Sequence, residues 1–168
     1  RINSSDPVNV PGEILTKGPN VLLGYYKNEE DTGQTIDKDG WFHTGDLGLM
    51  DEDGNVFIKG RSKNMLLGSN GQNIYPEEIE DKLNSLPLVS ECLVIQSGEK
   101  LIALVHPDYD EAQNLGLNAD DLKNIMEENR TQLNTIVPAY CKVAEIRIQE
   151  EEFEKTPKKS IKRFLYTE

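Results

Sequence analysis

Cysteine and histidine are scarce in this 168-residue sequence, and their scarcity argues against two kinds of site. The two cysteines, Cys92 and Cys141, are too few and too far apart for a disulfide framework or a Cys-x-x-Cys metal site, so we expect two reduced thiols. The two histidines, His43 and His106, belong to no His, Cys or carboxylate cluster at ligand spacing. We therefore expect no metal site in the chain.

Long apolar runs and targeting segments are also lacking. No run approaches the roughly 20 residues that cross a membrane, so no transmembrane segment is expected. The first residues lack the basic and apolar regions of a secretory signal, and we expect a cytoplasmic location. The chain begins with Arg1 rather than with methionine, and its first residues resemble the interior of a longer sequence. We therefore expect a piece of a longer polypeptide.

Positive charge is in short supply, with 18 Lys and Arg against 30 Asp and Glu and a net charge of −12. This balance argues against non-specific nucleic-acid binding. Residues 155–163 are the exception, because the segment KTPKKSIKR holds five basic residues and no acidic one. Such an island is either a solvated face or a local site for an anion.

The first 60 residues predict short strands joined by turns. The segments GEILTKG and GNVFIKG have strand patterns, the second with Val56 and Ile58 on one face, and the turn signals DKDG and DEDG follow the first segment. These features predict a small antiparallel sheet or barrel. A short helix is compatible only with the segment NEEDTGQTI.

From residue 74 the pattern becomes helix, strand, strand, helix, strand. Pro76 suits a first helical position, and Ile79, Leu83 and Leu86 form an apolar stripe after it. The runs SECLVIQ and KLIALVH, joined by SGEK, predict a hairpin, and VAEIRIQ predicts the last strand. The order predicts a compact α+β unit of roughly 95 residues.

The second predicted helix of this unit has both of its ends marked. Asn118 is a plausible N-cap, and Pro138 stops the helix. The predicted buried face consists of Leu122, Ile125, Met126, Leu133 and Ile136.

A glycine-containing loop, LGSNGQN, separates the two regions and invites comparison with a phosphate-binding loop. A Walker loop requires GxxxxGK[ST], but here Gly71 is followed by Gln72 and Asn73. The GxGxxG pattern is absent as well. By itself the loop is a tight turn.

Six segments occur in a fixed order: GEI, GYYKNEEDT, DGWFHTGDLG, GRSK, GQNIYPEEIE and EFEKTPKKSIKR. From Pro11 onward the chain resembles the adenylate-forming superfamily of acyl-CoA synthetases, luciferases and peptide-synthetase adenylation domains. The wording of GSNGQNIYPEEIE and EFEKTP is most similar to bacterial long-chain fatty acid–CoA ligases. The resemblance implies adenylation of a carboxylate by ATP, followed by thioester formation with CoA.

The resemblance also implies an organisation into domains. Residues 1–60 would be the β-rich tail of a large adenylate-forming domain, 61–63 a hinge, and 64–168 a C-terminal lid domain with a mixed sheet and packed helices. The lid would pack on its own N-terminal domain, with fatty acid, ATP and CoA as small-molecule substrates and Mg²⁺ accompanying ATP. No cofactor would be tightly bound to this piece, which alone would be inactive.

Three residues in the strand-rich region and at its end match family positions. Asp46 would accept hydrogen bonds from the ribose hydroxyls, as an acceptor-only carboxylate can, whereas the alternative is a turn-capping residue. Arg61 would be a second ribose or phosphate contact, against the alternative of a surface salt bridge. Lys63 would be the hinge about which the lid rotates, against a solvated lysine.

The loop that follows matches the segment that lines the pantetheine channel after the lid has rotated. Small residues there permit close approach of the backbone. The residues assigned to this CoA channel are Gly68, Ser69, Asn70 and Gly71. Trp41 would suit a nucleotide or acyl pocket, but core packing explains a lone tryptophan at least as well, so Trp41 is not assigned.

The basic island departs from the family pattern, which is roughly PxTxxGKxxR. The alignment rests on Thr156, Ile161 and Arg163. It puts Ser160 at the position of the adenylating lysine and Lys159 at that of the glycine, with Lys158 and Lys162 nearby. Either a neighbouring lysine substitutes by a shift in register, or the enzyme adenylates without a lysine in that place. Of the neighbours, we assign the adenylation role to Lys159, whose point charge would offset the charge developing at the α-phosphate.

Two other functions remain open from the sequence. The chain would be a free-standing nucleotide- or partner-binding domain if its basic island docks an anion independently of a ligase. Alternatively, it would be the lid of an adenylation domain that serves a carrier protein. A Ser/Thr/Gly-rich loop followed by Lys, upstream on the same polypeptide, would favour the ligase.

Overall fold

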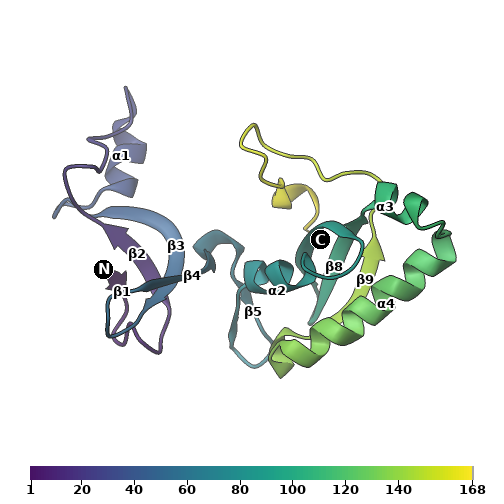
Figure 1. Ribbon diagram of the computed structural model, residues 1–168. Helices are drawn as coiled ribbons and strands as arrows, with labels where there is room; N and C mark the ends of the chain where they lie inside the picture. Colours follow the sequence, from purple (N-terminus) through teal and green to yellow (C-terminus); the bar gives the residue numbers. More distant parts are fainter. Residues whose placement is uncertain (168) are drawn as a thin grey trace. The chain divides into compact units, whose positions relative to one another are not determined.

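The computed structural model describes residues 1–167, which form two compact units, Arg1–Met65 and a second unit that begins at Leu66 (Figure 1). The first unit is built on a four-stranded antiparallel sheet in the order β1-β2-β3-β4. Its elements are β1 (Ile2–Asn3), β2 (Gly12–Thr16), α1 (Glu29–Thr35), β3 (Phe42–Met50) and β4 (Val56–Arg61). The predicted antiparallel sheet is confirmed, as is the short helix.

The first unit buries little apolar surface. Within the described residues, Ile2 and Leu15 are its only buried large apolar side chains. Helix α1 is capped by Asn28, whose side chain accepts a hydrogen bond from the Asp31 N–H at 3.0 Å, but the helix buries none of its residues. Strand β4 exposes three consecutive apolar side chains, Val56, Phe57 and Ile58.

The second unit combines a small hairpin with a three-stranded mixed sheet. The hairpin pairs β5 (Leu66–Leu67) with β6 (Asn73–Ile74), and the sheet contains β7 (Val89–Ser97), β8 (Lys100–Pro107) and β9 (Val143–Ile148). Strands β7 and β8 are antiparallel, whereas β8 and β9 are parallel. The helices are α2 (Pro76–Leu83), α3 (Tyr109–Asn114) and α4 (Ala119–Ile136). The predicted α+β class is confirmed; α3 was not predicted.

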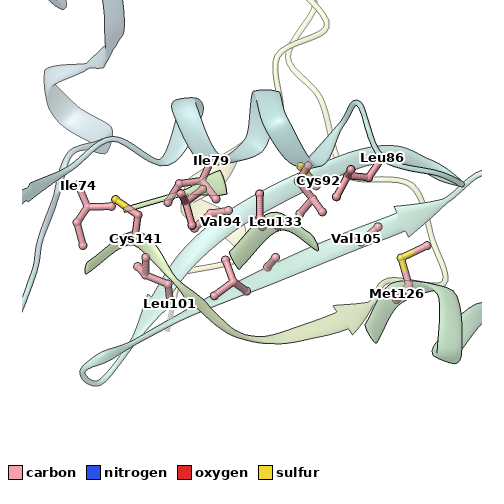
Figure 2. Close-up of a cluster of buried hydrophobic side chains, with 14 residues drawn as sticks. Ile74, Ile79, Leu86, Cys92, Val94, Leu101, Val105, Met126, Leu133 and Cys141 are labelled. Atoms are coloured by element: carbon pink, nitrogen blue, oxygen red, sulfur yellow. The ribbon is translucent and has the colours of Figure 1, made fainter. Parts of the chain in front are cut away.

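One face of the mixed sheet packs against α2 and α4. Successive residues of a strand point to opposite faces, so Cys92 and Val94 of β7 share this face with Leu101 and Val105 of β8. Figure 2 shows these side chains with Ile79 of α2 and Leu133 of α4 in one apolar cluster. The cluster also contains Cys141. Both thiols are buried, and burial raises the pKa of Cys92 far above its usual range and that of Cys141 to about 11.

The opposite face of the sheet is covered by the C-terminal segment, residues 149–167. Leu93, Ile95, Ile102 and Leu104 point to this face and pack with Phe153, Ile161 and Tyr166 of the segment. In Figure 1 the segment, in yellow, leaves the end of β9 and turns back toward α2 and β8. Because both faces are covered, β7 and β8 read as continuous apolar runs in the sequence.

Helix α4 follows the prediction at its start and departs from it at its end. The Asn118 side chain accepts from the Asp121 N–H at 3.1 Å, and the Asp121 carboxylate accepts from the Asn118 N–H at 2.9 Å, so the predicted cap is confirmed. The prediction that Ile136 is buried was wrong, because the helix ends there and Val137 takes the buried position instead. Asn129 is also buried and donates to the Pro87 carbonyl at 2.8 Å.

Every helix within residues 1–167 is too short or too polar to cross a membrane.

Candidate functional site

Asp46 and Arg61 lie opposite each other in the first unit. The antiparallel register of β3 and β4 pairs the two residues, and Arg61 Nε lies 2.9 Å from Asp46 Oδ1. Arg61 Nη1 also donates to the Thr44 carbonyl at 3.3 Å. The fold thus brings together two predicted site residues that are 15 positions apart in the sequence. The pair offers a hydrogen-bond acceptor and a cationic donor side by side on the surface.

The irregular stretch of β3 that carries Asp46 is held by Glu13, a residue that was not among the predicted site residues. Glu13 accepts from the Gly45 N–H at 3.0 Å through one carboxylate oxygen and lies 2.7 Å from His43 Nδ1 through the other. Gly45 has φ +71°, which favours glycine, and the Asp46 N–H donates to Thr44 Oγ1 at 3.0 Å. Glu13 belongs to the GEI segment, one of the six segments that carry the resemblance, and no role was predicted for its carboxylate.

Trp41 is not a core residue. It is half-buried, with Arg1 Cζ 4.2 Å and Lys17 Nζ 5.8 Å from its ring centroid, so its ring lies under two cations. Its backbone N–H donates to Asp37 at 2.9 Å and is the main cause of the lowered pKa of Asp37. Trp41 therefore organises the turn before β3.

Lys63 lies in a 3₁₀ turn, Ser62–Asn64, and its side chain is exposed. The boundary between the two compact units follows Met65. The predicted hinge residue therefore lies two residues before the boundary between the two units. The segment around it has a single 3₁₀ turn as its regular structure.

The loop assigned to the CoA channel is the tip of the β5–β6 hairpin. The Gly68 N–H donates to the Gln72 carbonyl at 2.8 Å, and the Gly71 N–H donates to the Gly68 carbonyl at 2.9 Å. Gly71 has φ +73°, which the turn requires. A side chain at position 68 would lie 3.3 Å from both the Gln72 carbonyl oxygen and Ile74 Cδ1, so glycine there permits the tight turn.

Three of the four assigned loop residues, Gly68, Ser69 and Asn70, line a groove of about 470 Å³ in the second unit. Its other lining residues are Gln72, Ile74, Gln96, Glu99, Lys100, Leu101, Ala139, Tyr140, Lys142 and Ala144. The charged residues among them are Lys100, Lys142 and Glu99, so the lining carries one more positive than negative side chain. The sequence pattern did not indicate that these two lysines would join the loop.

The basic island forms a tight hairpin in the C-terminal segment. The Lys159 N–H donates to the Thr156 carbonyl at 2.8 Å, and the Thr156 N–H donates to the Ser160 carbonyl at 2.8 Å. Pro157 takes the second position of the turn, where its fixed φ fits. Lys159 has φ +62°, in the left-handed region that favours glycine. This conformation fits the alignment of Lys159 with the family's glycine.

Three of the five basic residues in this island are held in ion pairs. Lys155 Nζ lies 2.6 Å from Glu91 Oε1, Lys162 Nζ lies 3.1 Å from Glu154 Oε2, and Arg163 pairs with Glu80. Lys158 and Lys159 are exposed and form no ion pair within residues 1–167. The positive charge available to an anion at this hairpin is therefore that of Lys158 and Lys159.

Glu80 of α2 is a buried carboxylate with two partners. One oxygen accepts from the Val94 N–H at 2.6 Å, and the other pairs with Arg163, which also donates to the Val94 carbonyl at 3.4 Å. Burial raises the pKa of Glu80, and the charge of Arg163 opposes that rise. Because β7 is an edge strand, the pair satisfies backbone groups of Val94 that have no strand beside them.

Residues 63–168 match the family model described as the AMP-binding enzyme C-terminal domain, and the chain belongs to this family. Its relatives are acyl-CoA and aryl-CoA ligases of the adenylate-forming superfamily. It is 38% identical over 165 residues to probable acyl-activating enzyme 9 of Arabidopsis thaliana, covering 95% of this chain and 28% of the relative. It is 48% identical over 94 residues to 2-succinylbenzoate–CoA ligase of Bacillus cytotoxicus, covering 56% and 19%.

Solved structures of full-size relatives contain the same fold. An anthranilate CoA ligase in complex with anthranoyl-AMP matches with a TM-score of 0.79 and 26% identity, over 95% of this chain and 29% of that one. The O-succinylbenzoate–CoA synthetase of Bacillus subtilis in complex with AMP matches with a TM-score of 0.68 and 26% identity, over 94% and 30%. The chain thus spans less than a third of the length of each of these relatives.

Proposed function

We propose that this chain is the C-terminal part of an ATP-dependent fatty acid–CoA ligase. A carboxylate oxygen of the acid attacks the α-phosphate of ATP and releases pyrophosphate. The CoA thiol then attacks the acyl carbonyl of the adenylate and releases AMP. Residues 1–60 belong to the end of the large domain, residues 61–63 form the hinge, and residues 64–168 form the lid that packs on that domain.

The observation that carries this proposal is the state of the basic island. Three of its cations are already neutralised by Glu80, Glu91 and Glu154, which leaves Lys158 and Lys159 at the hairpin tip. If the island were only a solvated basic face, there would be no reason for three of its cations to be held in ion pairs while the two at the hairpin tip are left exposed. In the proposed reaction, Lys159 offsets the negative charge that develops as the carboxylate attacks the α-phosphate.

Asp46 and Arg61 are proposed to hold the nucleotide. Their ion pair in this structure is 2.9 Å long and partly exposed, so the ribose hydroxyls can reach the carboxylate and a phosphate can reach the guanidinium. Lys63 is the proposed pivot. Magnesium is proposed to enter with ATP as part of the substrate.

The proposed CoA channel is formed by Gly68, Ser69, Asn70 and Gly71. The small residues Gly68 and Ser69 among the lining of the groove support this assignment, because small residues permit close approach of a ligand to the backbone. The lysines of the groove, Lys100 and Lys142, complement the negative charge of CoA.

The half-reactions of the full-length protein test the lysine assignment. Lys159→Ala is expected to slow ATP–pyrophosphate exchange by about 100- to 1,000-fold, the usual effect of losing one group that stabilises developing charge. Formation of acyl-CoA from a supplied acyl-adenylate should be unchanged. Lys158→Ala is the matched control and should have the smaller effect. Unchanged exchange in Lys159→Ala would show that the assignment is wrong.

A long-chain fatty acid is proposed as the substrate because the sequences of residues 68–80 and 152–166 resemble those of bacterial long-chain fatty acid–CoA ligases. The relatives include 2-succinylbenzoate–CoA ligase of Bacillus cytotoxicus and probable 4-coumarate–CoA ligase 2 of Dictyostelium discoideum, so aromatic acids are the rival substrates. Acyl-CoA formation by the full-length protein, measured for fatty acids of increasing length and for aromatic acids, separates the two. Faster turnover of an aromatic acid would overturn the fatty-acid assignment. The cytoplasmic location stays a prediction.

A second candidate is an adenylation domain that transfers its acyl group to a carrier protein. It is favoured by one structural match, the adenylation–carrier didomain of a carboxylic acid reductase from Segniliparus rugosus, with 25% identity, a TM-score of 0.72 and coverage of 86% of this chain and 21% of that one. Free CoA distinguishes the candidates. A ligase forms acyl-CoA at a rate that saturates with CoA, whereas a carrier-dependent domain leaves the acyl-adenylate unconsumed.

A further inference from the structure

We infer that the buried ion pair between Glu80 and Arg163 is a positioning element for the adenylation step. It fixes the hairpin that presents Lys158 and Lys159. The inference rests on the proposed function for its catalytic consequence, but the mechanical part, that the pair holds the hairpin, stands on the contacts themselves.

The two arms of the hairpin are each anchored to the body of the second unit. Before the tip, Lys155 Nζ contacts Glu91 on β7 at 2.6 Å, and hydrogen bonding to Glu91 is the main cause of the raised pKa of Lys155. After the tip, Arg163 reaches Glu80 on α2. Lys155 and Ile161 pair across the stem as an isolated antiparallel bridge. The tip therefore lies between two fixed points.

The Glu80–Arg163 anchor is the better defined of the two. The side chains of Arg163 and Glu80 are 21% and 10% exposed, against 27% for both Lys155 and Glu91. Glu80 is itself held by the Val94 N–H, and Arg163 by the Val94 carbonyl, so the pair is tied to the middle of β7 as well as to α2. Because Arg163 is held by both Glu80 and the Val94 carbonyl, the backbone on either side of Arg163 has little freedom to move.

A further ion pair of the segment, between Glu154 and Lys162, behaves differently. Glu154 and Lys162 are both part of the C-terminal segment, and the Glu154 side chain is 65% exposed. This pair links the two arms of the hairpin to each other and does not reach α2 or β7. It therefore offers a matched control, because it has the same charges and lies beside the same hairpin without tying the hairpin to the rest of the unit.

A positioning role is distinct from a stabilising one in its effect on the two half-reactions. Adenylation is proposed to use the hairpin, whereas thioester formation is proposed to use the β5–β6 loop. Loss of position at Lys159 would slow only adenylation, since a displacement of about 1 Å can cost about 100-fold in rate. Unfolding of the unit would slow both steps.

The test is a double variant, Glu80→Gln with Arg163→Met, in the full-length protein. The amide oxygen introduced by Glu80→Gln can still accept from the Val94 N–H, and no buried charge is left without its partner, so the fold is expected to survive. At saturating ATP, ATP–pyrophosphate exchange should fall by about 10- to 100-fold. Conversion of a supplied acyl-adenylate should stay within about twofold of the wild-type rate, because it does not use the hairpin.

The control is Glu154→Gln with Lys162→Met, which should leave both half-reactions within about twofold of wild type. Amide hydrogen exchange provides a readout that needs no activity. The N–H groups of Thr156 and Lys159, which close the hairpin, should exchange faster in the Glu80→Gln, Arg163→Met variant and unchanged in the control.

The outcomes separate the inference from the function on which it rests. Unchanged adenylation in the Glu80→Gln, Arg163→Met variant overturns the positioning role, and so does an equal loss in both half-reactions with a lowered melting temperature. Unchanged amide exchange overturns the mechanical part. Faster exchange in a protein whose wild type performs no adenylation would overturn the proposed function while the anchor itself is supported.

Discussion

The two units of the chain treat their β-sheets in opposite ways. The mixed sheet of the second unit is covered on one face by α2 and α4 and on the other by the C-terminal segment. The four-stranded sheet of the first unit has Ile2 and Leu15 as its only buried large apolar side chains among the described residues, and β4 exposes Val56, Phe57 and Ile58. Because successive residues of a strand point to opposite faces, Val56 and Ile58 are exposed on one face of β4 and Phe57 on the other, so both faces of this strand expose apolar side chains. The second unit has a core of its own, and the first does not.

The difference between the two units should be clearest when they are produced separately. Residues 66–168 alone are expected to unfold in one cooperative transition, because the hydrophobic clusters on both faces of the mixed sheet lie within them. Residues 1–65 alone should show no cooperative transition, since so little apolar surface is buried. Thermal unfolding followed by circular dichroism measures both. A sharp transition for residues 1–65 would contradict the comparison.

Core truncations test the same difference between the units within the whole chain. Leu133 of α4 is fully buried, so Leu133→Ala should lower the free energy of unfolding of the second unit by about 2–5 kcal/mol. Leu15→Ala removes the same atoms from the first unit and should leave the second unit's transition in place. Urea denaturation followed by circular dichroism measures the change. Equal effects of the two substitutions on that transition would show that the units do not unfold separately.

Helix caps give a smaller effect in the same direction. Asn118 caps α4, which lies on the core, and Asn28 caps α1, which buries no residue. Asn118→Ala should lower the free energy of unfolding of the second unit by about 0.5–2 kcal/mol. Asn28→Ala should not change that transition. An Asn118→Ala protein as stable as wild type in urea would mean that the hydrogen bonds that the Asn118 side chain accepts from the Asp120 and Asp121 N–H groups contribute nothing.

The smallest expected effect is a difference in pH dependence. Burial raises the pKa of Glu80 above its ordinary value of 4.5, so its favourable contribution to stability is present below pH 4.5 and is lost as pH rises through the raised value. Asp37 in the first unit has a lowered pKa, and its contribution is lost only as pH falls below 3.8 through the lowered value. Urea denaturation of wild type and Glu80→Gln between about pH 4 and 7 tests the first statement. The advantage of wild type should shrink as pH rises, and a constant or growing advantage would contradict it.

The sequence was sufficient for most elements because their patterns are local. Apolar runs predicted β7 and β8, a proline and an apolar stripe predicted α2, and Asn118 marked the start of α4. The prediction for Ile136 was wrong because periodicity continues the apolar face to the last helical residue, whereas the structure moves burial to Val137 as the chain leaves the helix. Helix α3 has a single buried residue, Ala112, and therefore no apolar stripe to reveal it.

The candidate site was less accessible, because its contacts join distant segments. The family motifs pointed to Asp46 and Arg61, but their contact follows from the register of β3 and β4. The roles of Glu13 and Glu80 could not be predicted, since the partners of both carboxylates are far away in the chain. Glu13 accepts from the Gly45 N–H in β3, and Glu80 pairs with Arg163. The hairpin of residues 155–161 was visible only as a run of charges, and nothing in that run distinguishes an anchored lysine from a presented one.

The two cysteines make the second unit its own chemical reporter. Only a thiolate is alkylated efficiently, and a thiol with a pKa of about 11, as at Cys141, remains protonated and shielded at neutral pH while the cluster is closed. Alkylation of these thiols is therefore expected to be slow while the apolar cluster stays closed and to speed up when it opens. Because residues 1–65 contain no cysteine, the alkylation rate reports local opening of the second unit alone and gives no information on the first unit.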